Sequence, residues 1–174
     1  GKRMKYNLLL LLLSSAVFAN ITNLNNFQAE FEQSITDEKN KKITYMGTMQ
    51  ASKPSYALWK YTKPIDKTVY VLRNKVIMVE PDLEQAIIKT IDSNFDFFTL
   101  LQSAKEIKKD IYTAIFNNIK YTIYTHGLTV ESIHYSDEFD NKVDITFKKQ
   151  KVNQGVDINL FNPYIPKEFD IIRD

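Results

Sequence analysis

Most of this 174-residue chain alternates between apolar and polar side chains, and this period of two constrains its fold more than any other feature. Within residues 43–51, the odd positions hold Ile, Tyr, Gly, Met and Ala, whereas the even positions include Thr44, Thr48 and Gln50. Such alternation is typical of a strand with one buried face. Turn residues such as Asn117-Asn118 and Asp140-Asn141 separate the alternating segments. We therefore expect an antiparallel sheet whose strands are joined by short turns.

The same pattern recurs at about eleven places along the chain. Segment 111–116 is the weakest of these, because Ile107, Ile111 and Ile115 would also suit one face of a helix. The predicted strands cover 31–35, 43–51, 56–61, 68–73, 76–80, 84–91, 111–116, 120–125, 130–135, 142–148 and 155–161. An antiparallel meander of this kind closes, or half-closes, into a barrel.

Two segments have helical spacing instead. Leu24, Phe27 and Phe31 stand at i, i+3 and i+7 within residues 21–31, which predicts an N-terminal helix. Residues 93–96 resemble a capping box, and apolar residues follow at positions 97, 100, 101 and 104, which predicts a mid-chain helix. Residues 103–106 resemble a second helix start. The predicted fold class is α+β and mainly antiparallel β, with helices only near the start and in the middle.

The first 19 residues have the order of a secretory signal peptide. Three basic residues precede an apolar run of about 11 residues, and Val17-Phe18-Ala19 places small side chains at the −3 and −1 positions of a cleavage site. The run is too short to span a bilayer, which needs about 20 residues. We expect cleavage after Ala19, which leaves residues 20–174 as a single domain.

The leader also accounts for the positive charge of the chain. The whole sequence carries a formal charge of +2, whereas residues 20–174 hold 20 basic and 21 acidic side chains. This near balance argues against a nucleic-acid partner. The chain has no cysteine, and Asn20 stands where an exported lipoprotein would carry its lipid-bearing Cys. We therefore expect an unanchored protein of the periplasm.

No pattern of catalytic or metal-binding residues stands out. The two histidines, His126 and His134, are eight residues apart and lack a metal-ligand spacing, so neither a metal nor a cofactor is predicted. Too few glycines remain after the leader for a phosphate-binding loop. A hydrolase would need a nucleophile beside one of the histidines, and structural roles for both are favoured. The sequence thus predicts a protein that is not an enzyme.

Large apolar side chains are concentrated in segments that are expected to face one another. They either fill a core or form a surface for an apolar ligand, and composition alone does not separate the two. These residues are Phe27, Phe31, Met49, Trp59, Tyr70, Phe95, Phe97 and Phe98.

Four segments in order carry a family resemblance. Residues 27–33 read F-Q-A-E-F-E-Q, and residues 53–64 read K-P-S-Y-A-L-W-K-Y-T-K-P. Residues 82–86 read D-L-E-Q-A, and the chain closes with F-N-P-Y-I-P at 161–166. This set, spread over residues 20–174, resembles the periplasmic outer-membrane lipoprotein carrier family, LolA.

The resemblance implies an eleven-stranded unclosed barrel with a helical lid over an apolar cavity for lipoprotein acyl chains. It also implies a monomer without cofactors that takes its cargo from an ATP-driven releasing complex of the inner membrane and delivers it to an acceptor at the outer membrane. A lipid- or lipoprotein-sensing regulatory module on the same fold is the alternative.

Two positions depart from the family pattern. The family has an Arg at the position of Lys53 that holds the lid shut, so Lys53 becomes the latch, and Lys offers a point charge in place of a planar fork. Ala57 stands where the family usually has a bulky Phe in the cavity. The expected cavity and lid residues are Phe27, Phe31, Met49, Ala57, Trp59, Tyr70, Phe95 and Phe98.

Overall fold

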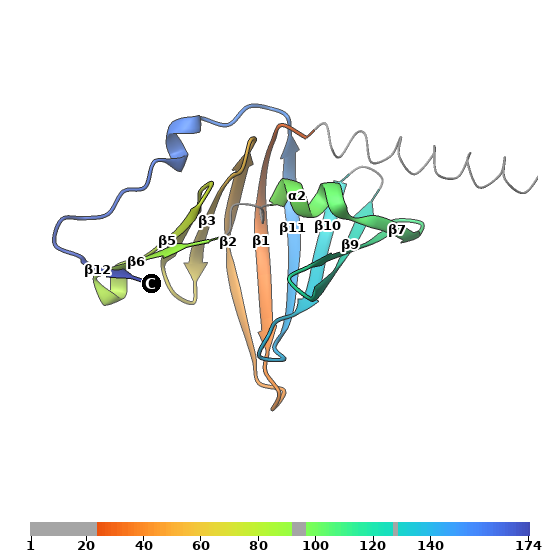
Figure 1. Ribbon diagram of the computed structural model, residues 1–174, viewed down its shortest axis with the longest axis horizontal. Coiled ribbons are helices and arrows are strands. Elements are labelled where there is room, and N and C mark those ends of the chain that lie inside the picture. Colours follow the sequence, from red (N-terminus) through yellow and green to blue (C-terminus); the bar gives the residue numbers. More distant parts are fainter. Residues whose placement is uncertain (1–23, 92–96, 127–128) are drawn as a thin grey trace, which may run out of the picture.

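One curved sheet dominates the computed structural model, which describes residues 24–91, 97–126 and 129–174 (Figure 1). In the described chain, twelve strands follow the order β12-β6-β5-β4-β3-β2-β1-β11-β10-β9-β8-β7, and the two edge strands do not pair with each other. The strands are β1 Asn26–Thr36, β2 Lys42–Ser52, β3 Tyr56–Lys63, β4 Lys67–Val71, β5 Lys75–Glu80, β6 Gln85–Thr90, β7 Lys105–Lys108, β8 Ile111–Phe116, β9 Ile119–His126, β10 Thr129–Ser136, β11 Lys142–Val152 and β12 Asp170–Arg173. The prediction of a mainly antiparallel, unclosed sheet is confirmed, with one strand more than the eleven expected.

Strand β1 joins the two halves of the chain. It pairs antiparallel with β2 along its whole length on one side and with β11 on the other. The prediction of a helix over 21–31 is therefore wrong for residues 26–31, whereas residues 21–23 lie outside the described part. Phe27 and Phe31 also fit a strand, because Phe27, Ala29 and Phe31 share one face at a period of two. Pairing on both sides outweighed the local helical spacing.

Two further local predictions differ from the structure, and one strand was not predicted. The helix start expected at 103–106 is a helix end, because Ser103 Oγ donates to the Leu100 carbonyl and β7 begins at Lys105. The strand expected at 155–161 is a 3-10 helix, η2 (Ile158–Phe161), which is capped by the Asp157 side chain. Strand β12 was not predicted, and it runs parallel to β6, unlike every other neighbouring pair.

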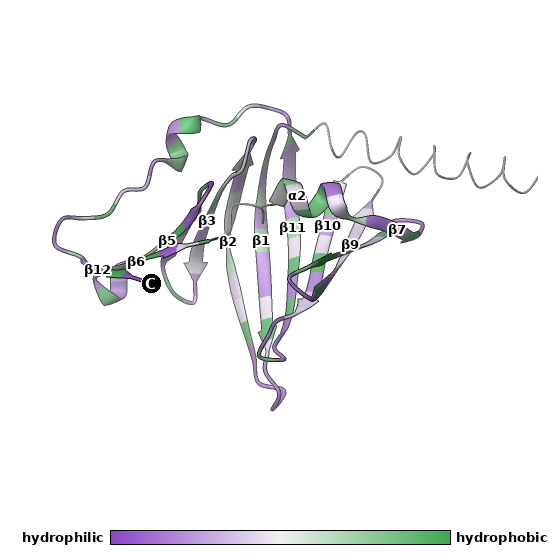
Figure 2. Cartoon of the chain, in the orientation of Figure 1, coloured by the Kyte–Doolittle hydropathy of each residue, from purple (hydrophilic) through white to green (hydrophobic). Residues whose placement is uncertain are grey.

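Two layers cover the sheet on opposite faces. Helix α2 (Phe97–Ser103) lies over the face that we call the inner face, which carries Phe27, Phe31 and Met49. The C-terminal segment, residues 153–169, packs against the outer face of β3 to β6 (Figure 1). Hydrophilic residues occupy the tip of the β1–β2 hairpin, at the far end of the long strands from α2 (Figure 2). Among the described residues, no helix is both long and apolar enough to cross a bilayer.

Gly47 permits a close approach between β2 and β3. A Cβ atom at this position would lie 1.9 Å from the Lys60 carbonyl oxygen and 2.9 Å from the ring of Phe31. The register of the two strands shifts between Met46 and Gly47, so the backbone is bulged there. Only glycine fits this approach, because a side chain would meet the Lys60 backbone and the Phe31 ring.

Candidate functional site

The inner face carries the larger apolar cluster of the protein, and strand pairing sets its rows. Ala29 pairs with Met49, and Met49 pairs with Trp59. Phe27 pairs with Ala51, which pairs with Ala57 in turn. Residues paired across neighbouring strands point to the same face, so these rows place side chains from three strands side by side.

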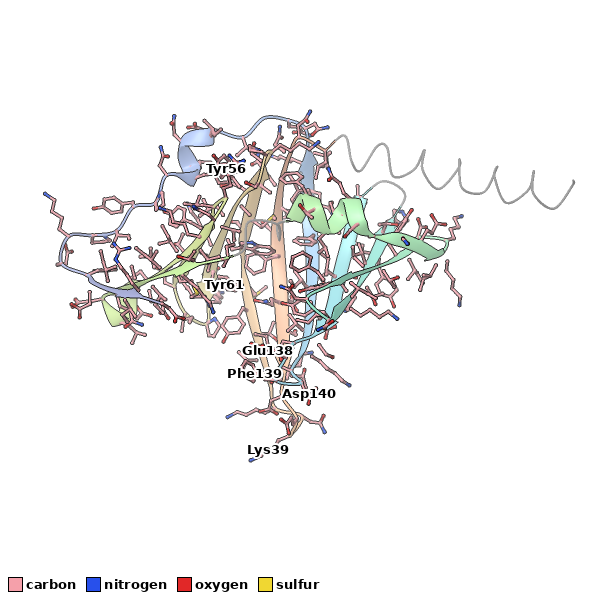
Figure 3. The ribbon with its side chains drawn as sticks, viewed as in Figure 1. Lys39, Tyr56, Tyr61, Glu138, Phe139 and Asp140 are labelled. Carbon is pink, nitrogen blue, oxygen red and sulfur yellow. The ribbon has the colours of Figure 1, made fainter. Side chains whose placement is uncertain are left out.

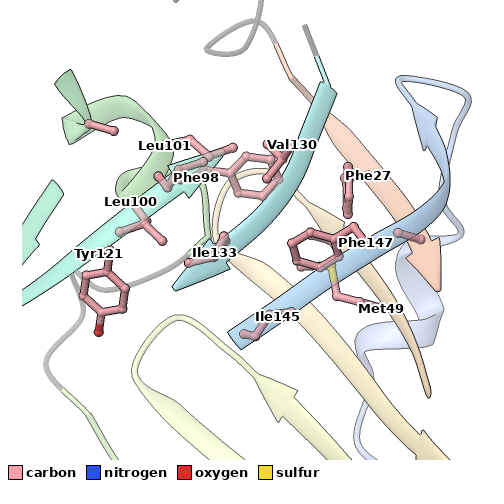
Figure 4. Close-up of a cluster of buried hydrophobic side chains, with 14 of the residues drawn as sticks. Phe27, Met49, Phe98, Leu100, Leu101, Tyr121, Val130, Ile133, Ile145 and Phe147 are labelled. Atoms are coloured by element: carbon pink, nitrogen blue, oxygen red, sulfur yellow. The ribbon is translucent and has the colours of Figure 1, made fainter. Parts of the chain in front are cut away.

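Aromatic rings interlock in the middle of this cluster. Phe31 lies edge-on between Trp59 and Tyr61, with both ring centroids 5.0 Å away. Phe27 lies edge-on to Phe147 of β11 at 5.5 Å. Edge-to-face geometry is favourable between aromatic rings. Figure 4 shows Phe27, Phe147 and Met49 together beneath the strands.

Helix α2 covers one end of the cluster with only seven residues. Its Phe98, Leu100 and Leu101 side chains are buried against the sheet (Figure 4). The helix has no acidic residue in its first turn and no basic residue in its last turn. A helix of this length is not stable alone, so its buried side chains hold it in place. The cover on this face is thus short, and it makes apolar contacts with the cluster.

Six of the predicted site residues meet in this cluster. Trp59 is half-buried and packs at its margin, whereas the other five are buried. The six residues are Phe27, Phe31, Met49, Ala57, Trp59 and Phe98. The predicted Phe95 lies outside the described residues. Phe97 is the first residue of α2.

Tyr70 does not lie with them, and its prediction as part of the same surface is wrong. Tyr70 of β4 pairs with Leu58 of β3, whereas Val71 pairs with Ala57 and Val69 pairs with Trp59. Alternation therefore sends Tyr70 to the outer face, into a second apolar cluster beneath the C-terminal segment. The members of this second cluster are Leu58, Tyr70, Ile77, Val79, Ala86 and Phe161.

Lys53, the predicted latch, follows β2 directly. Its backbone N–H donates to the Asn25 carbonyl oxygen at 2.8 Å, which ties the end of β2 to the residue just before β1. The side chain is half-buried. This end of β2 lies at the level of α2 in Figure 1.

Sequence reasoning missed the part of the cluster that comes from the second half of the chain. Ile145 and Phe147 of β11 and Val130 and Ile133 of β10 are all buried there. The alternation in the predicted strands 130–135 and 142–148 already marked an apolar face on each. It did not reveal that β11 would pair with β1 and bring these residues next to Phe27 and Phe31.

Tyrosines line the part of the inner face nearer the hairpin tips. Burial raises the pKa of Tyr121, and burial together with the nearby Tyr121 and Asp137 raises the pKa of Tyr135 to about 12. Burial also raises the pKa of Tyr61 well above its ordinary value, with the Tyr135 and Tyr45 hydroxyls adding to the effect. These hydroxyls are protonated at neutral pH, as ordinary tyrosine hydroxyls are, and can donate hydrogen bonds.

His134 belongs to a hydrogen-bonded chain on the outer face. Its Nε2 atom lies 2.8 Å from Ser132 Oγ, and its Nδ1 atom lies 2.5 Å from Asp144 Oδ1. The neighbouring Ile133 points to the opposite face, into the larger cluster. The arrangement supplies a hydroxyl beside a histidine, but the sheet separates it from the apolar residues of the inner face. Among the described residues, no group of His, Asp and Glu side chains could hold a metal ion.

Comparison with known proteins decides the family. Residues 22–113, more than half of the chain, match the family model "Outer membrane lipoprotein carrier protein LolA". The chain belongs to the LolA family. An outer-membrane lipoprotein carrier protein of Wolinella succinogenes is 32% identical over 171 residues, which cover 98% of this chain and 99% of the relative. The LolA relative of Campylobacter jejuni is 36% identical over 157 residues, 90% of this chain and 92% of its own.

Solved structures support the LolA fold at low sequence identity. An uncharacterized conserved protein of Thermus thermophilus superposes with a TM-score of 0.57 at 10% identity, over 92% of this chain and 98% of that protein. A putative outer membrane lipoprotein-sorting protein domain of Vibrio parahaemolyticus has a TM-score of 0.50 at 9% identity, over 87% and 95% of the two chains. These likenesses concern the fold alone.

Proposed function

We propose that this protein is a lipoprotein carrier that holds the acyl chains of its cargo on the inner face, beneath α2. One observation carries the proposal: a seven-residue helix with three buried apolar side chains covers an apolar cluster on an unclosed sheet. Membership of a family of carriers, at 32–36% identity to named relatives, supports it.

In this proposal, α2 occupies the place of the cargo when the protein is empty. Phe98, Leu100 and Leu101 lie against the cluster, and acyl chains would replace them when the helix moves away. Each methylene that leaves water contributes about 0.8 kcal/mol, so cargo cannot cross an aqueous space unshielded. Replacing three side chains offsets part of that gain, which keeps the carrier able to release its cargo into a membrane. Lys53 serves as latch and Phe95 as part of the lid.

The proposed carrier works in the periplasm after cleavage of residues 1–19. It receives lipoproteins from an ATP-driven releasing complex of the inner membrane and delivers them to an acceptor at the outer membrane. It acts as a monomer, and transfer between two membranes that bury the acyl chains equally well requires no catalysis by the carrier. A lipid-sensing module is the alternative on this fold, and it would bind lipid without passing lipoprotein onward.

A matched pair of variants on β3 tests the site. Trp59→Glu places a charge on the inner face and is expected to abolish co-purification of acylated lipoprotein from periplasmic extracts, as measured by mass spectrometry. Tyr56→Glu changes the outer face of the same strand, where Tyr56 stacks on Phe161 at 5.6 Å, and is expected to retain cargo in the folded fraction. His134→Ala is a second control, because carrying does not use the outer-face chain.

Each contrary result has a defined meaning. If the Trp59→Glu variant still co-purifies with a normal amount of lipoprotein, the acyl chains do not bind on the inner face. Free lipid without lipoprotein on the parent protein would favour the sensor over the carrier.

A further inference from the structure

The inner face has a polar margin that the acyl chains of a cargo would not use. We call it the tyrosine rim, and it consists of Gln33, Tyr45, Tyr61, Lys67 and Tyr135. Gln33 pairs with Tyr45 across β1 and β2, two positions beyond Phe31 toward the hairpin tips. Figure 3 shows Tyr61 between the level of α2 and the tips that carry Lys39 and Asp140. The rim therefore lies at the end of the inner face away from α2.

The members of the rim contact one another through polar groups and ring faces. The Tyr61 hydroxyl donates to Gln33 Oε1 at 2.8 Å. The rings of Tyr45 and Tyr61 meet edge to face at 5.7 Å. Lys67 Nζ lies 4.5 Å from the ring centroid of Tyr61 and 5.7 Å from that of Tyr45. A cation over two aromatic rings is held in position without a carboxylate.

The rim spans the curved sheet from Lys67 of β4 to Tyr135 of β10. Tyr61 of β3 and Tyr135 of β10 both pack against the larger apolar cluster, although four steps in strand order separate their strands. The curved sheet therefore places tyrosines from both sides of the inner face at the margin of one cluster. Because both groups stay protonated, each can donate a hydrogen bond at neutral pH.

The rim offers donors that the protein itself leaves unused. Within the described residues, the Gln33 amide nitrogen and the Tyr135 hydroxyl have no hydrogen-bond acceptor, and Lys67 has no ion-pair partner. The side-chain oxygen of Gln33 is already taken by Tyr61. A ligand that fits must therefore supply acceptors, and it must join an apolar part that reaches the cluster beneath α2.

We infer that the tyrosine rim binds the ester and amide carbonyl groups that link the acyl chains of the cargo to its polypeptide. This inference rests on the proposed carrier function and adds an orientation to it. The chains point toward α2, their carbonyl oxygens accept from Gln33, Tyr135 and Lys67, and the polypeptide leaves at the hairpin end. Carbonyl oxygens only accept hydrogen bonds, which matches a rim whose unused groups can all donate.

Two synthetic lipopeptides with the same chains and the same peptide provide the test. One carries ester-linked chains, and the other carries ether-linked chains without carbonyl oxygens. The parent protein is expected to bind the ester form roughly ten-fold more tightly, as expected for a few neutral hydrogen bonds, measured by tryptophan fluorescence. The double variant Gln33→Leu, Tyr135→Phe keeps only Lys67 of the three donors, so it is expected to lose most of the ester preference, with its affinity for the ether form unchanged.

Controls separate the rim from general effects on the protein. Tyr124→Phe removes an exposed hydroxyl from the outer face of β9 and is expected to keep the ester preference. Circular dichroism and urea unfolding establish that each variant is folded before binding is compared. Equal binding of both lipopeptides by the parent protein would overturn the inference but not the carrier function.

The remaining outcomes are also decisive. If neither lipopeptide binds the parent protein, the carrier function itself fails. If the double variant weakens both forms to the same extent, the rim supports the fold and does not recognise carbonyls. A third outcome is that palmitate displaces the lipopeptides, that Lys67→Met prevents this displacement, and that the parent protein shows no ester preference. The rim would then bind a free carboxylate, and the inference would be wrong.

Discussion

The two faces of strand β3 carry apolar clusters of similar chemistry but with different covers. Ala57 and Trp59 face the larger cluster under α2, whereas Leu58 faces the second cluster under the C-terminal segment. The C-terminal segment is anchored at both ends, because it continues β11 and ends in β12, which pairs with β6 over four residues. Helix α2 has only seven residues and lies on the sheet by side-chain contacts.

This difference separates a structural core from a surface that can open. Backbone hydrogen bonds such as Asp170 N–H to the Glu84 carbonyl must break before the C-terminal cover can leave. Helix α2 is not part of the sheet, so it can leave without breaking the strand pairing, and local regions of a fold open at free energies below that of global unfolding. The cover, rather than the composition, distinguishes the two clusters.

The largest expected effect is at the fixed cover. Phe161→Ala removes a buried ring that stacks on Tyr56 and leaves a cavity in the second cluster. We expect the free energy of unfolding to fall by about 3–5 kcal/mol in urea titrations. Cargo binding by the folded fraction should be unchanged. A loss below about 1 kcal/mol would mean that the C-terminal segment is not a fixed part of the core.

A smaller effect is expected at the removable cover. Phe98→Ala removes a ring of similar burial from α2. Because the protein can open α2 locally while the sheet stays folded, the lost contacts of Phe98 affect global unfolding less. We expect the free energy of unfolding to fall by only about 1–2 kcal/mol. Binding of an apolar dye should increase at the same time. A loss as large as that of Phe161→Ala, without dye binding, would remove the distinction between the two covers.

The smallest effect concerns the polar margin of the larger cluster and is a change in how stability falls at alkaline pH. The pKa of Tyr135 is raised in the folded protein, above the value of about 10 in an unfolded chain. The stability that the protonated Tyr135 hydroxyl contributes is therefore complete below pH 10, and it is lost as the pH rises from about 10 through 12. Tyr135→Phe should make the alkaline fall in stability shallower, as measured by urea unfolding at several pH values. An unchanged slope would contradict burial of this hydroxyl.

Several features of the fold could be predicted from local pattern. The alternation within residues 43–51 predicted β2 and the face shared by Met49 and Ala51. Segment 111–116, which also suited a helix, is a strand because it pairs with β9 along its whole length. The failure at residues 26–31 has the same cause, since two neighbouring strands provided backbone partners that a local period does not reveal.

The sequence by itself determined the short alternating segments, the turns between them and the apolar side of each strand. It also carried the ordered motifs of the LolA family. Only the tertiary structure decided which apolar sides share a space: it placed Trp59 with Phe31 and Phe147 and sent Tyr70 to the other face. The physical reason is that alternation fixes two faces on every strand, whereas the pairing of distant strands and the cover laid over each face decide which becomes a fixed core and which can receive a ligand.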